Sequence, residues 1–575
     1  MVSIGVGKPG EVMSPRWAAT LGAVLLVLPL APVHHAGQGA ADGLPRNKTL
    51  YASGTATSPP GNFNPLDLAA YTGTQGLLYE PLFLFDPVHA KFIPWLATGG
   101  SWVNATTYKL QVRNGVRWAS SPNGSPRGAL TGADVAYTVR LAAQDEADPY
   151  HPDVTSVKDA TAAGDTVTVT FEQPVGYAQW QQFLFHAPVL PTAVWSKLTA
   201  GGQVSSPNLA PVSTGPMLLV SRGSSEACYR DNPNWWARAQ LGLSFKFEYL
   251  CDVVSRSSGA DLSALVDNRT DWSNALLRGV PNLVGGNTGG YGIKTYYPGA
   301  PYMLPAGTVS LEMDTARAPM SNVYFRRAVA YALDPSAIIS SVYTGTVSVA
   351  NPTGLLPYLS SYINSVAVKS YGFYYSASLA EKFLDKSGYK GQHLTLEVPM
   401  AWADWMEAAT ELSRQLEKIG IHVSAKFVPV AAFDADVANG NYDMVIDDAT
   451  GLCPTPWSYY DAIYRLPEKG TQGQGLNTER FSDSSVWALV RQAGTTPMAD
   501  TDLLRSLYAV VEADFLQEVP EVPLWYGGAW FQASTAYWEN YPASTSRQDQ
   551  YTPMMGPGWL GSTTTVYALA ELRPH

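Results

Sequence analysis

The sequence predicts an α/β protein with two lobes. The chain has 575 residues, more than one hydrophobic core normally supports, so two or more domains are expected. Residues from about 46 to 305 show mixed strands and loops, whereas strands and helices alternate from about residue 306 onwards. This change of pattern, taken together with the length, favours two α/β lobes.

The N-terminus has the composition of a secretory signal. Arg16 precedes an apolar run over residues 17–33, and small residues such as Ala36 and Ala41 follow it. A basic start, a short apolar core and a small-residue cleavage region are typical of a signal peptide, which we place at residues 1–41. The run contains prolines and is shorter than the roughly 20 residues that span a bilayer. An uncleaved membrane anchor is the alternative.

The three cysteines leave two readings open. Cys228 and Cys251 lie in or beside two strand-like runs, residues 217–220 with their extension and residues 243–250. Export permits a disulfide between them, but all three cysteines, including Cys453, could equally be buried thiols. Without paired C-x-x-C spacing they form no zinc framework. We expect no metal and no cofactor.

Residues 311–339 predict a strand, a turn and two helices. Phe325, Ala328, Val329 and Ala332 recur at helical spacing, and Ser321 is a suitable N-cap for that helix. Asp334 followed by Pro335 predicts the start of a second helix, because a cap residue precedes a proline in the first turn.

The next part predicts a βαβ unit and two neighbouring helices. Residues 394–398 and 421–428 are strand candidates, and an apolar helical stripe between them runs from Trp405 to Ile419 and stops at Gly420. Strands joined in this way should be parallel. A helix before the unit begins after Ser376 and stops at Gly388. A helix near residues 433–438 and a strand over residues 442–447 follow the unit. In the first part of the chain, residues 166–171 (TVTVTF) alternate as a half-buried strand does.

Two loops are predicted to face a ligand, because ligands of open α/β sheets bind beyond the carboxyl ends of the strands. These loops are residues 400–405 and residues 449–460, and both are aromatic. The candidate ligand-binding residues are Trp402, Asp404 and Trp405 in the first loop, Trp457, Tyr459 and Tyr460 in the second, and Trp525 and Tyr526 in a later segment. Asp404 could also cap its helix. Core packing is the alternative for each aromatic residue, and the apolar stripe that begins at Trp405 favours it there.

Composition narrows the class of partner. The net charge is −11 and only 15% of the residues are charged, which disfavours nucleic acid and a polybasic membrane surface. The chain has 32 Tyr and 17 Trp residues, whose flat apolar faces and polar edges suit ligands that are partly polar.

Several phrases in a fixed order resemble the family 5 extracytoplasmic solute-binding proteins of ABC importers. They include the strand–turn–helix phrase at 311–339, FNPL at 63–66, LYEPLF at 78–83, VRNGVRW at 112–118, ADVAYT at 133–138 and STGP at 213–216. Each phrase alone is weak, but their order over several hundred residues is specific.

The resemblance implies a two-lobed fold of the periplasmic-binding-protein type II kind. Lobe one would comprise residues 42–305, with an extra subdomain near residues 80–210. Lobe two, residues 306–520, would be inserted into it, and residues 521–575 would return to lobe one. Two crossing segments, near residues 308–314 and 519–525, would form the hinge.

The resemblance also implies the function. An oligosaccharide or oligopeptide would be captured between the lobes and delivered to ABC permease subunits, at the outer face of the membrane. The protein would be held there through the permease or an uncleaved N-terminal anchor. We include Asn64, from the family's opening loop, among the ligand-binding residues.

The sequence favours a sugar over a peptide as the ligand. Peptide-binding members typically hold the peptide's amino group with an Asp in a Trp-x-x-Asp phrase, which is missing here, and the 454–460 pattern PTPWSYY resembles cello-oligosaccharide-type members. Glu312 and Asp314 depart from the usual Asn at that strand end, and they could hold an amine or accept hydroxyl groups.

The chief alternative from another class is a secreted glycosidase with paired carboxylates. The sequence contains no G-x-S-x-G and no H-E-x-x-H phrase, and its eight histidines are scattered. We therefore expect a binding protein and no enzyme. A sensory or adhesion protein with the same fold is a further alternative, because fold alone does not fix use.

Overall fold

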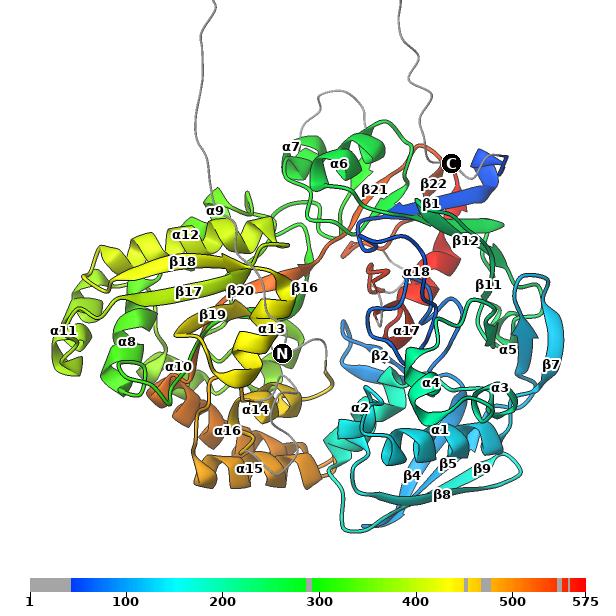
Figure 1. Ribbon diagram of the computed structural model, residues 1–575, viewed down its shortest axis with the longest axis horizontal. Helices are drawn as coiled ribbons and strands as arrows, with labels where there is room; N and C mark the ends of the chain where they lie inside the picture. Colours follow the sequence, from blue (N-terminus) through cyan, green and yellow to red (C-terminus); the bar gives the residue numbers. More distant parts are fainter. Residues whose placement is uncertain (1–42, 286–291, 449–452, 467–476, 546–550, 557–558) are drawn as a thin grey trace, which may run out of the picture. The chain divides into compact units, whose positions relative to one another are not determined.

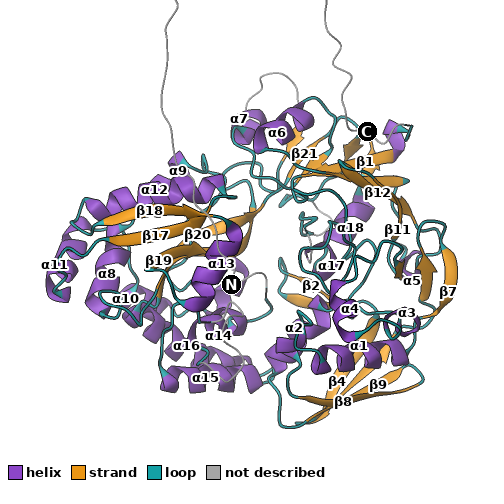
Figure 2. Ribbon diagram, in the orientation of Figure 1, coloured by secondary structure: helices purple, strands orange, loops and turns teal. Residues whose placement is uncertain are grey.

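Strands from distant parts of the chain assemble into a first, seven-stranded sheet (Figures 1 and 2). The structure, a computed structural model, describes residues 43–285, 292–448, 453–466, 477–545, 551–556 and 559–575. β1 pairs in parallel with β13 and β14, and the remaining pairs are antiparallel. In sheet order the strands are β11 (Met217–Arg222), β12 (Glu226–Asp231), β13 (Tyr249–Val253), β1 (Thr49–Ser53), β14 (Trp272–Ser273), β21 (Gln532–Ser534) and β15 (Ile293–Lys294).

A smaller antiparallel sheet of four strands is covered by helix α1 (Gly132–Gln144). Its strands are, in order, β4 (Ala97–Asn104), β5 (Thr107–Val112), β9 (Thr166–Phe171) and β8 (Val157–Ala163). β9 has the predicted bounds, and its side chains alternate between half-buried and buried. The short strands nearby are β10 (Val212–Ser213), β6 (Arg117–Ser120), β7 (Ser125–Ala129), β2 (Phe83–Asp86), β3 (Lys91–Pro94), β22 (Trp538–Glu539) and β23 (Arg573–Pro574).

The helices of these parts are mostly short. They are α2 (Tyr177–His186), α3 (Thr192–Trp195), α4 (Ala200–Ser205), α5 (Trp236–Leu241), α6 (Ser258–Val266), α7 (Val280–Gly285), α17 (Trp559–Ser562) and α18 (Thr565–Glu571), with 3₁₀ turns at Arg46–Lys48 and His151–Asp153.

The second large sheet has five strands and contains the predicted βαβ unit. Its order is β18 (Val423–Val428), β17 (Leu394–Pro399), β19 (Met444–Asp447), β16 (Leu304–Met313) and β20 (Glu521–Ala529). β17 is parallel to β18 and β19, and β16 is antiparallel to β19 and β20. Helix α12 (Ala403–Glu417) packs on β17 and β18, as the apolar stripe predicts.

The remaining helices accompany this sheet. They are α8 (Val323–Ala332), α9 (Pro335–Ser341), α10 (Ser365–Tyr371), α11 (Ala377–Ser387), α13 (Val430–Asn439), α14 (Trp457–Tyr464), α15 (Ser484–Thr495) and α16 (Thr501–Glu518), with a 3₁₀ turn at Pro357–Tyr362. Ser376 caps α11 and Asp334 caps α9, as predicted.

Two predicted caps are wrong. The N-cap of α8 is Asn322, whose Oδ1 accepts a hydrogen bond of 2.9 Å from the backbone of Tyr324, so Ser321 lies outside the helix. Asp404 does not cap α12, because that helix starts at Ala403 and its N-cap position is Trp402. In both cases the cap residue was placed one or two positions from its true site, a common error at helix ends.

The hydrophobic interior has two large parts. One is drawn mostly from residues 50–296 and 526–572, and the other mostly from residues 309–525. We call them the first core and the second core. The chain passes from the seven-stranded to the five-stranded sheet between β15 and β16, at residues 295–303, and returns between β20 and β21, at residues 530–531. The segments that we predicted to cross, near 308–314 and 519–525, lie largely within β16 and β20 instead. The lobe boundaries themselves stay a prediction.

Cys228 on β12 and Cys251 on β13 form a disulfide. The two residues are direct partners in the antiparallel register, with Cα atoms 4.1 Å apart. Cys453 is a buried free thiol. The bridged alternative is therefore the one that the fold adopts. The predicted signal peptide, residues 1–41, lies outside the described residues.

Candidate functional site

The loop between β17 and α12 presents an exposed tryptophan, Trp402. Its side chain is 42% exposed, and its ring lies edge-on to that of Trp405, with centroids 4.7 Å apart. Trp405 is buried and belongs to the second core. Because the loop follows the carboxyl end of β17, Trp402 is placed where ligands of such sheets bind.

Tyr343 connects this loop to strand β20. Its hydroxyl donates a 3.0 Å hydrogen bond to Oδ2 of Asp404, and its ring lies 5.2 Å from Trp525 and is stacked at 6.2 Å on Trp530. We call Tyr343, Trp402, Trp405, Trp525 and Trp530 the aromatic cluster. It brings together two of the three predicted segments, through a tyrosine that the sequence reasoning missed. No periodicity or motif marked Tyr343, because it follows the end of α9 and its partners are far away in sequence.

Burial governs the charges of this pair. Burial raises the pKa of Asp404, and the hydrogen bond from Tyr343 opposes that rise. The pKa of Tyr343 is raised well above its ordinary value, first by burial and then by the nearby Asp404. Tyr343 is therefore a neutral donor, and it holds Asp404 in the first turn of α12, two residues after Trp402.

Trp457, Tyr459 and Tyr460 are all buried on helix α14. The ring of Tyr460 packs against Tyr508 and Phe515 of α16. Trp457 lies so close to Gly494 that a Cβ there would meet its Nε1 at 2.4 Å. The spacing 457, 460 and 464 of these aromatic residues is helical, a signal for core packing that the loop assignment overlooked.

Asn64 and Tyr526 have their polar atoms engaged within the protein. Asn64 is fully buried, and its Nδ2 donates to the carbonyl groups of Gln203 and Val204 at 2.9 Å each. The hydroxyl of Tyr526 donates to the carbonyl of Leu355 at 2.7 Å and accepts from the backbone of Asn351 at 2.9 Å. Their role as ligand contacts stays a prediction, as does that of the other candidate residues.

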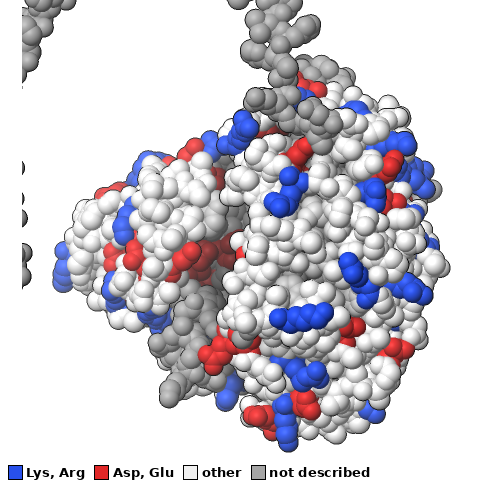
Figure 3. All heavy atoms as spheres, turned by 45° about the vertical axis from the view of Figure 1, so that its right-hand side comes forward, with Lys and Arg blue, Asp and Glu red and all other residues white. Residues whose placement is uncertain are grey.

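Carboxylates gather at the carboxyl end of β19 and in the strands beside it. Asp447 ends β19, and burial raises its pKa to about 6. Glu312 and Glu521 are fully buried on β16 and β20. On the face shown in Figure 3, Asp and Glu side chains gather in a recess, whereas Lys and Arg are spread singly over the surrounding surface.

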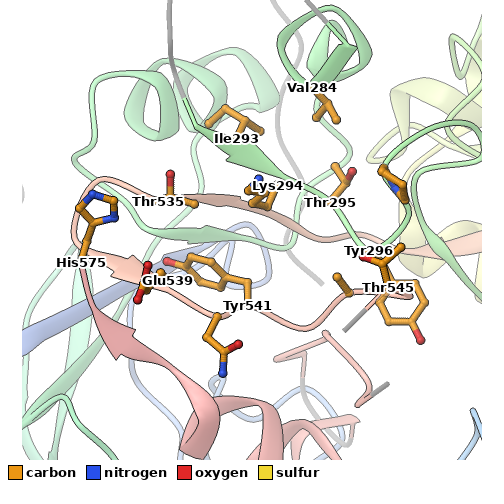
Figure 4. A pocket seen from close by; sticks show the side chains of 13 residues that line it. Val284, Ile293, Lys294, Thr295, Tyr296, Thr535, Glu539, Tyr541, Thr545 and His575 are labelled. Atoms are coloured by element: carbon orange, nitrogen blue, oxygen red, sulfur yellow. The ribbon is translucent and has the colours of Figure 1, made fainter. Parts of the chain in front are cut away.

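A described pocket lies elsewhere, in the first part of the fold. It has a volume of about 560 Å³, and its lining includes Lys294, Tyr296, Glu539, Tyr541 and His575 (Figure 4). None of the nine predicted ligand-binding residues lines it. It is also bordered by Val284 and Thr545, which lie next to stretches of the chain that the structure does not describe. It therefore does not coincide with the aromatic cluster.

Comparison with known proteins identifies the family. The model of the bacterial extracellular solute-binding proteins, family 5, matches residues 91–471. Among curated proteins, the nickel-binding periplasmic protein of Escherichia coli is 23% identical over 75% of this chain and 82% of its own. The di/tripeptide-binding protein 1 of Pseudomonas aeruginosa is 22% identical over 81% of this chain and 87% of its own.

Solved structures agree in fold. A periplasmic oligopeptide-binding protein of an oligopeptide ABC transporter from Thermotoga maritima has a TM-score of 0.84 and 33% identity, over 92% of this chain and 100% of its own. A second crystal structure of that protein, with mannohexaose bound, has a TM-score of 0.81 and 33% identity, over 92% of this chain and 99% of its own. These matches confirm the predicted α/β fold class.

The comparisons also bear on chemistry and location. The family consists of extracytoplasmic binding proteins, not of enzymes. Within the described residues, no helix has both the length and the apolar character to cross a membrane. With two thirds of its residues matched by the family model, the chain belongs to the family 5 bacterial extracellular solute-binding proteins, which serve ABC importers.

Proposed function

We propose that this solute-binding protein captures an oligosaccharide and delivers it to the permease of its ABC importer. The observation that carries the proposal is the Thermotoga structure with mannohexaose, since that protein is 33% identical to this one over 92% of this chain. That protein is described as oligopeptide-binding as well, so the similarity alone supports both ligand classes.

The aromatic cluster favours the sugar. Sugar rings present apolar C–H patches that rest on flat aromatic faces, and Trp402 offers such a face, with 42% of its surface exposed, at the carboxyl end of a parallel strand. The ring of Trp405 packs against Trp402, and the hydrogen bond from Tyr343 to Asp404 holds the start of α12 next to this loop. A neutral sugar also needs no buried counter-charge in the site.

A peptide is the second candidate, and the carboxylates favour it. Asp447 and Asp448, at the end of β19, could hold the amino group of a peptide, because Asp447 is half-buried and Asp448 is exposed. The missing Trp-x-x-Asp phrase weakens the case for a peptide. Asp447 and Asp448 could still supply the carboxylate that a peptide's amino group needs.

The test is a thermal-shift screen of the purified protein against mannohexaose, cello-oligosaccharides and mixed oligopeptides. A ligand that binds only the native state raises the melting temperature. At a ligand concentration of 100 times Kd, the free energy of unfolding increases by about 2.7 kcal/mol. We expect a shift with an oligosaccharide, and we expect Trp402→Ala to reduce it. Tyr371→Ala is the matched control, because Tyr371 is 43% exposed on α10. Shifts with peptides alone would replace the sugar by the second candidate.

The test also checks that the protein leaves the oligosaccharides uncleaved. After incubation with the protein, chromatography should return every oligosaccharide unchanged in length. Shortened products would make the protein a hydrolase and would contradict the proposal. Retention at the membrane, through the permease or an N-terminal anchor, we propose on the sequence alone, because residues 1–41 lie outside the described part.

A further inference from the structure

Three buried glutamates from separate segments meet in and beside the five-stranded sheet, where Glu312 is the register partner of Val445 on β19. Glu312 on β16 and Glu521 on β20 stand directly opposite each other in the antiparallel register. Glu479 reaches them from the loop before α15, and a carboxylate oxygen from each of the three lies within 4.8 Å of the others. All three side chains are at most 1% exposed. Like charges opposite each other in a sheet are destabilising, so these carboxylates need a compensating charge if they are ionised.

Glu479 is the observation that points to a ligand. When the three carboxylates are ionised, neither oxygen of Glu479 has a hydrogen-bond donor among the described residues, although the side chain is buried and directed at the Glu312–Glu521 pair. Its backbone is held in place, since its carbonyl accepts from the backbone and hydroxyl of Thr315 at 2.8 and 2.9 Å. A buried polar group without a partner costs free energy, and a buried charge costs much more.

In each of the other two glutamates, one carboxylate oxygen accepts hydrogen bonds and the other does not. One oxygen of Glu521 accepts from the hydroxyl groups of Ser310 and Tyr459, and one oxygen of Glu312 accepts from Thr478 at 2.6 Å. The second oxygen of each has no partner in the described part of the chain. Neutral donors therefore fix the orientation of two carboxylates, and each of the three glutamates keeps an oxygen free to bind something else.

No described cation balances this charge. Among the described residues, no Lys, Arg or His forms an ion pair with any of the three, whereas Glu397 on the nearby strand β17 is paired with Lys426 at 2.5 Å. Two further acidic residues lie close by. The charges of Asp447 and Asp448 raise the pKa of Glu312, and Asp448 is exposed at the surface.

We propose that Glu312, Glu479 and Glu521 bind a hard divalent cation of the Ca²⁺ type. Oxygen ligands lie about 2.3–2.6 Å from Ca²⁺, so ligands of one ion are at most about 5 Å apart, which the spacing of the three carboxylates satisfies. Carboxylate oxygens favour Ca²⁺, Mg²⁺ or Mn²⁺ over softer metals. The site would join β16, β20 and the loop before α15, and it is independent of the sugar proposal, because it uses none of the aromatic cluster.

Protons are the competing way to neutralise the cluster. The pKa of Glu479 is raised well above its usual range, first by burial and then by Glu312 and Glu521, so a protonated Glu479 could donate to Glu521. The two readings differ in what excess metal does at neutral pH. A cation site takes up an ion and gains stability from it, whereas a proton-sharing cluster does neither.

The experiment measures bound metal and melting temperature for the full protein. After EDTA treatment and dialysis against Ca²⁺, elemental analysis should find one ion per chain, and the melting temperature at pH 8 should rise by several degrees relative to the EDTA sample. Tb³⁺ should bind in place of Ca²⁺ and show luminescence excited through Tyr459, whose hydroxyl bonds to Glu521.

Two variants decide where the ion lies. Glu479→Gln should lose the ion and its stabilisation, and the matched control Glu397→Gln should keep both. Should Glu479→Gln fail to fold, Glu312→Gln and the wild-type metal content still decide the question. No bound ion and equal melting temperatures in EDTA and Ca²⁺ would overturn the proposal in favour of shared protons. Loss of the ion in both the Glu479 and Glu397 variants would overturn the assignment to this cluster.

Discussion

At the scale of single residues, tryptophans that look alike in the sequence have different surroundings. Trp402 is 42% exposed, whereas Trp525 is 1% exposed and Trp457 is 6% exposed within the second core. An exposed ring can stack on a ligand, and a buried one mainly fills space. The three substitutions to Ala should therefore separate binding from stability.

We predict that Trp402→Ala weakens ligand binding and leaves the melting temperature nearly unchanged. A lost stacking contact costs on the order of 1 kcal/mol or more. Trp457→Ala and Trp525→Ala should each lower the free energy of unfolding by roughly 3–5 kcal/mol, as in other cores. Measuring Kd and melting temperature for all three checks this. An unchanged Kd in Trp402→Ala would mean that the loop does not face the ligand.

At the scale of elements, the disulfide connects two neighbouring strands of the seven-stranded sheet. It closes a loop of 23 residues between β12 and β13, and such a cross-link restricts the unfolded chain. The third cysteine, Cys453, lies in the second core as a free thiol.

We predict that unreduced protein yields one linked peptide pair, Cys228 with Cys251, and one thiol that is alkylated only after unfolding. Replacing both bridged cysteines by Ser should lower stability by about 2–4 kcal/mol. Mass spectrometry and urea unfolding provide the measurements, with Cys453→Ala as the control for loss of a thiol without loss of a bridge. Three reactive thiols in the oxidised protein would contradict the structure.

At the scale of the whole molecule, burial raises the pKa of several carboxyl groups. The pKa of Glu80 is raised to about 7 by burial, although three indole N–H groups donate to its carboxylate: Trp95 at 3.0 Å, Trp235 at 3.1 Å and Trp236 at 3.1 Å. Burial likewise raises the pKa of Asp148 to about 7 and that of Asp252 to about 8. These groups favour the neutral form in the folded protein.

We predict that stability falls as the pH rises from about 5 to 8. A folded-state pKa above the unfolded value gives stability that is fully present below the unfolded pKa and is lost as the pH passes the folded pKa. For Glu80 the loss is on the order of 3 kcal/mol. Urea midpoints at pH 5 and 8, measured with EDTA present, test this. Glu80→Gln should show a smaller difference between the two, and a higher midpoint at pH 8 than at pH 5 would refute the prediction.

The two predicted lobes should move relative to each other when a ligand binds. We propose that ligand binding brings the predicted lobes together about the segments that join the two large sheets, residues 295–303 and 530–531. The radius of gyration from small-angle scattering should then decrease at saturating ligand. An identical scattering curve with and without a ligand that binds would argue against closure.

Local structure and family membership can be read from the sequence alone. Strand 166–171 alternates visibly, the stripe from Trp405 to Leu416 predicts α12, and glycines 388 and 440 end their helices in the left-handed conformation. These features depend on neighbours within a few positions, so periodicity and turn chemistry suffice. The ordered phrases likewise identified the family, because they are read directly along the chain.

Which distant side chains meet depends on how the elements pack in three dimensions. Tyr343 reaches Asp404 and Trp525, and Glu479 meets Glu312 and Glu521, across separations that no local pattern encodes. The aromatic residues of 457–460 were expected in a ligand-facing loop, yet their helix buries them against α16. Burial depends on how whole elements pack, and the same tryptophan in a sequence suits a core as well as a binding surface. The physical reason is that hydrophobic packing and charge desolvation act between elements far apart in the chain.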